Sequence, residues 1–335
     1  MNKEYPTINF IGNKEKIVDW IFDFVPKDVN IFFDGFSGGA SVSYEAKKRN
    51  FQVISNDVLK INYLISKSLV ENKKHKLSSK DVDTIFGGKP FSGYMHKNYS
   101  NYRFYPKECM ELDLYRANIE KLSNNYKKAM ALSLMRRSMI RKMPYSRFNI
   151  SWEKVKQLRD EEYSYKHYKR KRAYHNESFK KHFLDQIEEY NLSVFDNGKK
   201  NKAYNMDIFS LINKIDADLI YLDPPYPGTL NKYFDFYGML DEYIDSKKQD
   251  PFPNSFTNKN EALFLFERLL KLSSKKKYMV MSTGNKSFPD IVTLKRLAEQ
   301  NFKKVTIQEK EHVYKITGKK NKNINKEFLI IGKNA

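Results

Sequence analysis

The tetrapeptide Asp223-Pro224-Pro225-Tyr226 constrains the fold of this chain more than any other short segment. Each proline fixes its own φ and lacks a backbone donor, and the residue before each one is driven towards extended geometry. The mainly apolar run 217–222 leads into this corner, so a buried strand is predicted to end there. Because ligands bind at the carboxyl ends of strands in open α/β sheets, the corner predicts an α/β fold with a site at Asp223. An ordinary turn has the same local signature.

The chemistry of this corner suits a planar amino compound. The carboxylate of Asp223 and the carbonyl of Pro224 accept hydrogen bonds, whereas Tyr226 offers an aromatic face. A group that grips both the edge and the face of a nucleobase needs this combination. The corner is therefore a candidate nucleobase site.

A glycine-rich turn stands at the end of another predicted strand, 31–34, and a helix is predicted over 40–49. The following strand, 51–55, leads to Asp57, which lies 23 residues beyond Asp34, near the spacing of about 20 expected for a carboxylate that binds ribose. The dinucleotide and phosphate-loop glycine patterns are both missing, which favours a nucleoside ligand over NAD or ATP. A plain strand-to-helix turn is the alternative. The candidate ligand-binding residues are Asp34, Gly35, Phe36, Ser37, Gly38, Gly39 and Asp57.

The composition favours a polyanionic partner. The 335 residues include 61 Lys and Arg against 40 Asp and Glu, a formal net charge of +21. A lysine-rich genome would contribute to this surplus without any functional cause. Cys109 is the only cysteine, so a disulfide framework and a multi-cysteine zinc site are excluded and a cytoplasmic protein is expected. The first residues lack an apolar signal region, and no run approaches the ~20 apolar residues of a membrane span.

These motifs, in this order, resemble the alpha or D12 class of adenine-N6 DNA methyltransferases, the Dam-like group. That class also has an aromatic-x-Gly-x-Lys segment near its N-terminus, which Phe10 to Lys14 matches with Asn13 in place of the usual second glycine. Asp207 follows a further strand end, as in the class, where the matching residue meets the cofactor's adenine amino group. The resemblance covers roughly residues 6–75 and 200–332.

The resemblance implies a Rossmann-like methyltransferase sheet with helices on both faces, and S-adenosylmethionine as cofactor. Residues 1–75 and 200–335 would form the catalytic domain, and 76–199 an inserted, mainly helical target-recognition domain. The further residues that the resemblance assigns to the cofactor are Phe10, Gly12, Asn13, Lys14, Asp207 and Ile208, whereas it assigns catalysis to Asp223, Pro224, Pro225 and Tyr226.

The implied activity is methylation of the N6 amino group of an adenine flipped out of duplex DNA, with no metal required. The chain would be the modification enzyme of a restriction–modification system whose cognate endonuclease acts on the same site. Methylation of cytosine N4 or of RNA adenine is the alternative enzymatic function. A catalytically silent nucleic-acid-binding subunit is the non-enzymatic one, although the presence of Asp223 and the cofactor residues argues against it.

The middle of the chain is predicted to contact DNA. Residues 112–142 are predicted to form one long helix that ends before Pro144, and tyrosines alternate with basic residues over 163–175. Basic and aromatic side chains together suit phosphate neutralisation, base contacts and stacking, although a basic run alone is often only a solvated face. The candidate DNA contacts are Arg137, Arg141, Lys142, Tyr145 and Arg147.

Overall fold

The computed structural model describes residues 4–10, 12–143, 151–169, 175–227, 233–250, 256–312 and 325–334. The described residues fall into two compact units. We call residues 11–58, 197–233 and 251–335 the sheet unit, and residues 1–10, 59–196 and 234–250 the helical unit. The predicted insertion, 76–199, is shorter than the helical unit, which also takes in the first ten residues, 59–75 and 234–250.

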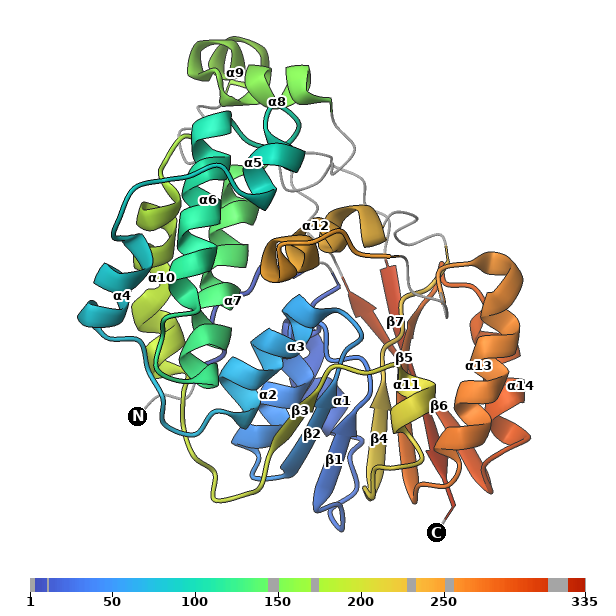
Figure 1. Ribbon diagram of the computed structural model, residues 1–335. Coiled ribbons are helices and arrows are strands. Elements are labelled where there is room, and N and C mark those ends of the chain that lie inside the picture. Colours follow the sequence, from blue (N-terminus) through green and yellow to red (C-terminus); the bar gives the residue numbers. More distant parts are fainter. Residues whose placement is uncertain are drawn as a thin grey trace. The chain divides into compact units, whose positions relative to one another are not determined.

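The sheet unit contains, within the described residues, a seven-stranded sheet in the order β3-β2-β1-β4-β5-β7-β6 (Figure 1). Its first five strands in this order are parallel, and β7 pairs antiparallel with both β5 and β6. The strands that were predicted at 31–34, 51–55 and 217–222 are all present. The strand bounds are β1 (Ile31–Asp34), β2 (Gln52–Asn56), β3 (Lys202–Tyr204), β4 (Leu219–Leu222), β5 (Tyr278–Gly284), β6 (Lys304–His312) and β7 (Asn325–Lys333).

Helices cover both faces of this sheet. Successive side chains of a strand point to opposite faces, so each buried strand packs against helices on both sides. Phe33 packs into the cluster formed with the helices after β3, β4 and β5, whereas its neighbour Phe32 stacks on Phe22 of the first helix, with ring centroids 5.4 Å apart. The Rossmann-like α/β fold is thus confirmed. The helices of the sheet unit are a 3₁₀ turn (Glu15–Ile17), α1 (Val18–Phe22), α2 (Ser41–Lys48), α11 (Ile208–Leu211), α13 (Lys259–Ser273) and α14 (Ile291–Glu299).

The helical unit is built around α7, which packs against α10, α3 and α6. A π-helical turn (Lys67–Glu71) extends α3, and all but the first residue of α12 belongs to this unit. No helix among the described residues is both long and apolar enough to span a bilayer. The helices are α3 (Lys60–Ser66), α4 (Ser79–Phe86), α5 (Tyr94–Tyr99), α6 (Pro106–Ile119), α7 (Asn125–Lys142), α8 (Trp152–Arg159), α9 (Glu161–Tyr168), α10 (Phe179–Leu192) and α12 (Tyr233–Asp245).

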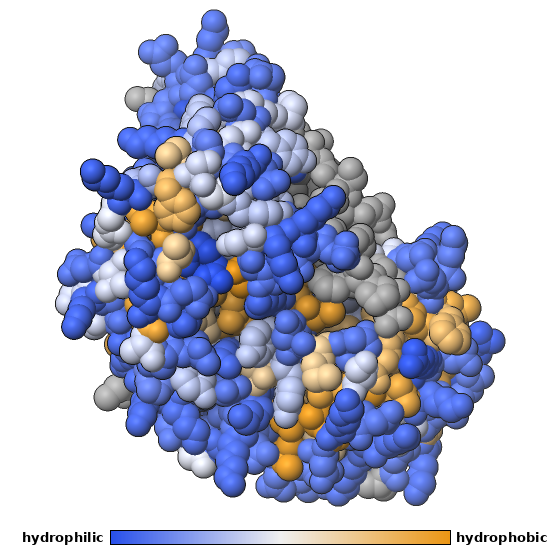
Figure 2. Space-filling model, viewed as in Figure 1, coloured by the Kyte–Doolittle hydropathy of each residue, from blue (hydrophilic) through white to orange (hydrophobic). Residues whose placement is uncertain are grey.

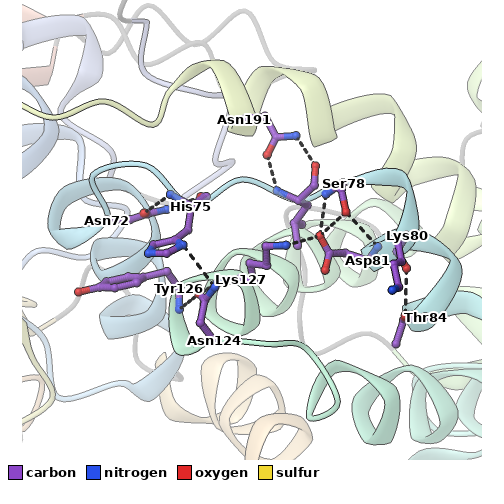
Figure 3. Close-up of polar contacts among 11 residues, drawn as sticks. Asn72, His75, Ser78, Lys80, Asp81, Thr84, Asn124, Tyr126, Lys127 and Asn191 are labelled. Carbon is purple, nitrogen blue, oxygen red and sulfur yellow. Dashed lines mark hydrogen bonds and ion pairs between the residues drawn. The ribbon is translucent and has the colours of Figure 1, made fainter.

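The prediction of one helix over 112–142 is wrong, since α6 ends at Ile119 and α7 begins at Asn125. The reason is the side chain of Asn124, whose oxygen accepts hydrogen bonds from the amides of Tyr126 and Lys127 and so caps a new helix (Figure 3). Lys127 then forms an ion pair with Asp81 of α4, with 2.7 Å between nitrogen and oxygen. The predicted stop at Pro144 lies outside the described residues.

Candidate active site at the carboxyl edge of the parallel strands

Four acidic residues that the sequence singled out follow the carboxyl ends of four adjacent parallel strands. Asp34 ends β1, whereas Asp57, Asp207 and Asp223 come after β2, β3 and β4. The chain runs outwards from β1 to β2 and β3 on one side, and β4 begins the other side, so the strand order reverses between β1 and β4. Ligands of open α/β sheets bind at such a switch point.

The turn after β1 is held by both neighbouring strands. The amide of Gly35 donates to the carbonyl of Tyr221 at 3.0 Å, and the amide of Ser37 donates to the carbonyl of Asn56 at 2.8 Å. Gly38 has a φ of +49°, and its amide donates to the carboxylate of Asp57 at 2.9 Å. Gly39 is not in the left-handed region, whereas Ala40 is, with a φ of +65°. The predicted strand, turn and helix are confirmed, and the turn has a defined conformation.

Asn56 is a site residue that the sequence motifs missed. Its buried side chain donates to the carbonyl oxygens of Gly35 and Met206 at 3.2 and 3.1 Å, and its own oxygen accepts the amide of Met206. It therefore joins the turn after β1 to the segment after β3. Its position at the end of a strand, next to Asp57, was the only signal available in the sequence.

Asp34 is only 1% exposed, and its carboxylate accepts a hydrogen bond from the hydroxyl of Ser43 at 2.6 Å. Burial raises the pKa of Asp34 from 3.8 to about 7, and the nearby charges of Asp223 and Asp57 raise it further, against the effect of the Ser43 hydrogen bond. Asp34 thus exchanges its proton near neutral pH.

Asp207 and Ile208 form the start of α11. The carboxylate of Asp207 accepts hydrogen bonds from the amides of Phe209 and Ser210, which makes it the N-cap of this helix. The side chain of Ile208 is buried, and a Cβ placed on Gly35 would lie only 3.2 Å from its terminal carbon. Ile208 therefore fixes how closely the first turn approaches α11.

The N-terminal segment brings a cation to Asp223. Gly12 has a φ of +83°, and the side-chain oxygen of Asn13 accepts the amide of Glu15 at 3.2 Å. The Nζ of Lys14 then lies 3.4 Å from the Oδ1 of Asp223. Phe10 belongs to the helical unit, where the guanidinium of Arg136 lies 5.8 Å from its ring centroid.

The side chain of Asp223 retains 23% of its exposure. Burial raises the pKa of this carboxyl to about 6, although Lys14 lowers it. Pro224 is buried and Pro225 is half-buried. The corner thus presents a carboxylate whose charge changes slightly below neutral pH.

Tyr226 is 6% exposed and belongs to the core of the sheet unit. Its ring stacks on Phe266 with centroids 5.1 Å apart, and its hydroxyl donates to the carbonyl of Ser282 at 2.5 Å. In this structure the ring therefore has an internal stacking partner. The predicted stack on a substrate base stays a prediction.

Two of the predicted DNA contacts lie inside the helical unit. Arg137 is 5% exposed and donates to Gln186 at 2.8 Å, and Lys142 is 2% exposed in its side chain and forms an ion pair with Glu108 at 2.9 Å. Burial lowers the pKa of both cations. We therefore remove Arg137 and Lys142 from the set of proposed DNA contacts. Arg141 is half-buried, and Tyr145 and Arg147 lie outside the described residues.

Exposed tyrosines occur instead on α9, which begins the tyrosine-rich run in the sequence, and half-buried Lys154 of the preceding helix α8 lies against two rings of that helix. Tyr165 and Tyr168 are 55% and 43% exposed. The Nζ of Lys154 lies 5.4 Å from the ring centroid of Tyr163 and 5.5 Å from that of Tyr168. This end of the helical unit is coloured mainly as hydrophilic in Figure 2. We call these four residues the α8–α9 surface.

The comparisons with known proteins agree with this geometry. Residues 10–316 match the family described as D12 class N6 adenine-specific DNA methyltransferase. The chain is 54% identical over 333 residues to the Type II methyltransferase M2.HphI of Haemophilus parahaemolyticus, covering 99% of both chains. It is 24% identical to the Type II methyltransferase M.CviAII of Paramecium bursaria Chlorella virus 1, covering 82% of each. It is also 28% identical to M.FokI of Planomicrobium okeanokoites, covering 70% of this chain and 36% of that protein. The chain therefore belongs to the D12 class of N6 adenine-specific DNA methyltransferases.

Proposed function

We propose that this protein transfers a methyl group from S-adenosylmethionine to the N6 of one flipped adenine at a specific duplex DNA sequence, as the modification enzyme of a restriction–modification system. The carboxylate of Asp223 at the strand switch point carries the catalytic part of this proposal. The Type II and modification-methylase names of several relatives support the restriction–modification context.

The acidic edge of the sheet fits this cofactor. The chain has a net charge of +21, yet the strand ends nearest the switch point carry Asp34, Asp57, Asp207 and Asp223. S-adenosylmethionine has a cationic sulfonium, an ammonium group, ribose hydroxyls and an amino group, all of which suit carboxylate partners. We assign it to the segment Gly12–Lys14, the turn 34–39, Asp57 and Asp207. When bound, the cofactor supplies an electrophilic methyl group.

Asp223 would activate the adenine amino nitrogen. The lone pair of this nitrogen is delocalised into the ring, so the nitrogen is a poor nucleophile. Asp223 and the carbonyl of Pro224 would accept its two N–H bonds and direct the lone pair at the methyl group. As the N–C bond forms and the bond between the methyl group and sulfur breaks, its electron pair would stay on sulfur and Asp223 would take the proton that the nitrogen loses. Alignment of this kind supplies up to roughly 7–11 kcal/mol of a barrier.

The flipped base must be extracted from the duplex at a cost of a few kcal/mol. We propose that the α8–α9 surface offsets part of this cost through DNA contacts, because Tyr165 and Tyr168 are exposed and Lys154 lies beside Tyr168. An aromatic stack on a base contributes roughly 1–3 kcal/mol, and each basic contact to phosphate adds salt-dependent affinity. Tyr226 stacks on Phe266 and so helps to hold the corner in place, and its stack on the flipped base stays a prediction.

The decisive experiment maps modified bases in DNA from cells that express the chain, with Asp223→Ala as the inactive control. We expect N6-methyladenine at one recurring sequence in the wild type and none with Asp223→Ala. The DNA should also resist an endonuclease that cuts the same sequence. N4-methylcytosine, methylated RNA, or N6-methyladenine that persists with Asp223→Ala would overturn the proposal.

A further inference from the structure

Lys14 lies between two carboxylates that are far apart in the sequence. Its Nζ is 2.5 Å from the Oε1 of Glu327 and 3.4 Å from the Oδ1 of Asp223. The side chains of Lys14 and Glu327 are only 10% and 6% exposed. Glu327 lies on β7, opposite Gly284 of β5, in the antiparallel part of the sheet. None of the motifs that identified the site includes Glu327.

Lys14 interacts more strongly with Glu327 than with Asp223. Charged hydrogen bonds between nitrogen and oxygen have lengths of about 2.7–2.9 Å, so Lys14 is bound closely to Glu327 and more loosely to Asp223. The three ionised groups together carry one net negative charge. The side chain of Asp223 is only partly exposed, so pairing with Lys14 stabilises its charged form.

We propose that Glu327 is a positioning residue for methyl transfer, which holds the ammonium of Lys14 near Asp223 but leaves the carboxylate of Asp223 available to accept a substrate N–H. Without Glu327, Lys14 would close on Asp223 and occupy the oxygen that the substrate needs. This inference rests on the proposed role of Asp223 as the acceptor.

The groups around Asp223 determine the sign of each perturbation. Burial is the main reason that the pKa of Asp223 is raised to about 6. Lys14 lowers this pKa and Glu327 raises it. Among the described residues, further titratable neighbours are Asp34, Tyr221 and Tyr226, whose pKa values the charge of Asp223 raises. Removing the charge of Glu327 should therefore lower the pKa of Asp223, whereas removing that of Lys14 should raise it.

The test follows the carboxyl of Asp223 by NMR in ligand-free protein labelled with ¹³C-carboxyl aspartate, with the signal assigned from Asp223→Asn. We expect the titration midpoint to fall by roughly one unit or more in Glu327→Gln and to rise by roughly one unit or more in Lys14→Met. The acid limb of kcat should move in the same directions. The plateau kcat of Glu327→Gln should fall at least tenfold with little change in KM for DNA.

The matched control is Glu309→Gln, which removes an exposed glutamate from the neighbouring strand β6, where it pairs with Lys326 at 2.6 Å. This variant should match the wild type in both measurements. Loss of kcat in Glu327→Gln without a shift of the Asp223 midpoint would show a merely structural role and overturn the inference. If Glu327→Gln fails to fold, an unshifted midpoint in Lys14→Met overturns it instead. Methylation that survives Asp223→Ala is a different result, which overturns the proposed function itself.

Discussion

The raised pKa of Asp34 predicts how the stability of the sheet unit depends on pH. The native carboxyl has a pKa of about 7, against an ordinary value of 3.8, so the native state binds this proton more tightly than the unfolded chain does. The resulting stabilisation is fully present below about pH 4 and is lost as the pH rises to about 7. Between pH 5 and pH 8 these two pKa values correspond to a loss of about 3 kcal/mol in the free energy of unfolding.

The substitution Asp34→Asn should remove this loss, because an amide does not ionise while its oxygen still accepts the hydroxyl of Ser43. The free energy of unfolding of the variant should therefore fall by about 3 kcal/mol less than that of the wild type between pH 5 and pH 8. Urea unfolding of ligand-free protein in a Trp152→Phe background measures this difference, because fluorescence then comes from Trp20 in the sheet unit.

Asp28→Asn is the control for this comparison. Asp28 is also in the sheet unit, but its hydrogen bond to Lys277 lowers its pKa, so it stays ionised between pH 5 and pH 8 in both states. Its pH dependence in this range should run parallel to that of the wild type. Our reasoning about Asp34 is refuted if Asp34→Asn also runs parallel to the wild type.

Three further predictions concern the same site. The substitution Gly35→Ala should lower stability by about 1–3 kcal/mol and weaken cofactor binding, because its Cβ would lie 3.2 Å from Ile208. Urea unfolding measures the stability and calorimetry measures cofactor binding, and wild-type values in both would contradict the prediction. Tyr226→Phe should cost about 1 kcal/mol of stability by leaving the carbonyl of Ser282 without its hydroxyl donor, and an unchanged urea midpoint would speak against it. The kcat of the wild type should fall about tenfold per pH unit below about pH 6, as Asp223 becomes protonated, and a flat profile down to pH 5 would exclude Asp223 as the acceptor.

Local sequence patterns predicted the elements that carry the site. Proline restricts φ and lacks a donor, whereas glycine permits a tight turn, so either residue after an apolar run marks where a strand ends. The ends of β1 and β4 therefore agreed with the prediction, as did the turn that begins at Gly35, and β2 ends one residue later than predicted. The break before Asn125 was missed because one capping asparagine outweighed a long helical pattern.

The burial and contacts of individual side chains could be determined only from the tertiary structure. Arg137 and Lys142 have the same local appearance as exposed cations, and only the packing of the helical unit shows that both are buried. The aromatic ring of Tyr226 likewise looks available in the sequence but stacks on Phe266. Burial depends on what other elements pack against a residue, which no local pattern contains.

The amino-acid pattern alone was enough to identify the strand ends, the class of the protein and the carboxylate at the proposed catalytic corner. The partners of that carboxylate were decided by the order of the strands. Because β7 inserts between β5 and β6, Glu327 comes within 2.5 Å of Lys14, although the two are 313 residues apart. Short-range rules govern where an element begins and ends, whereas the electrostatics of a site depends on distances that only the folded sheet establishes.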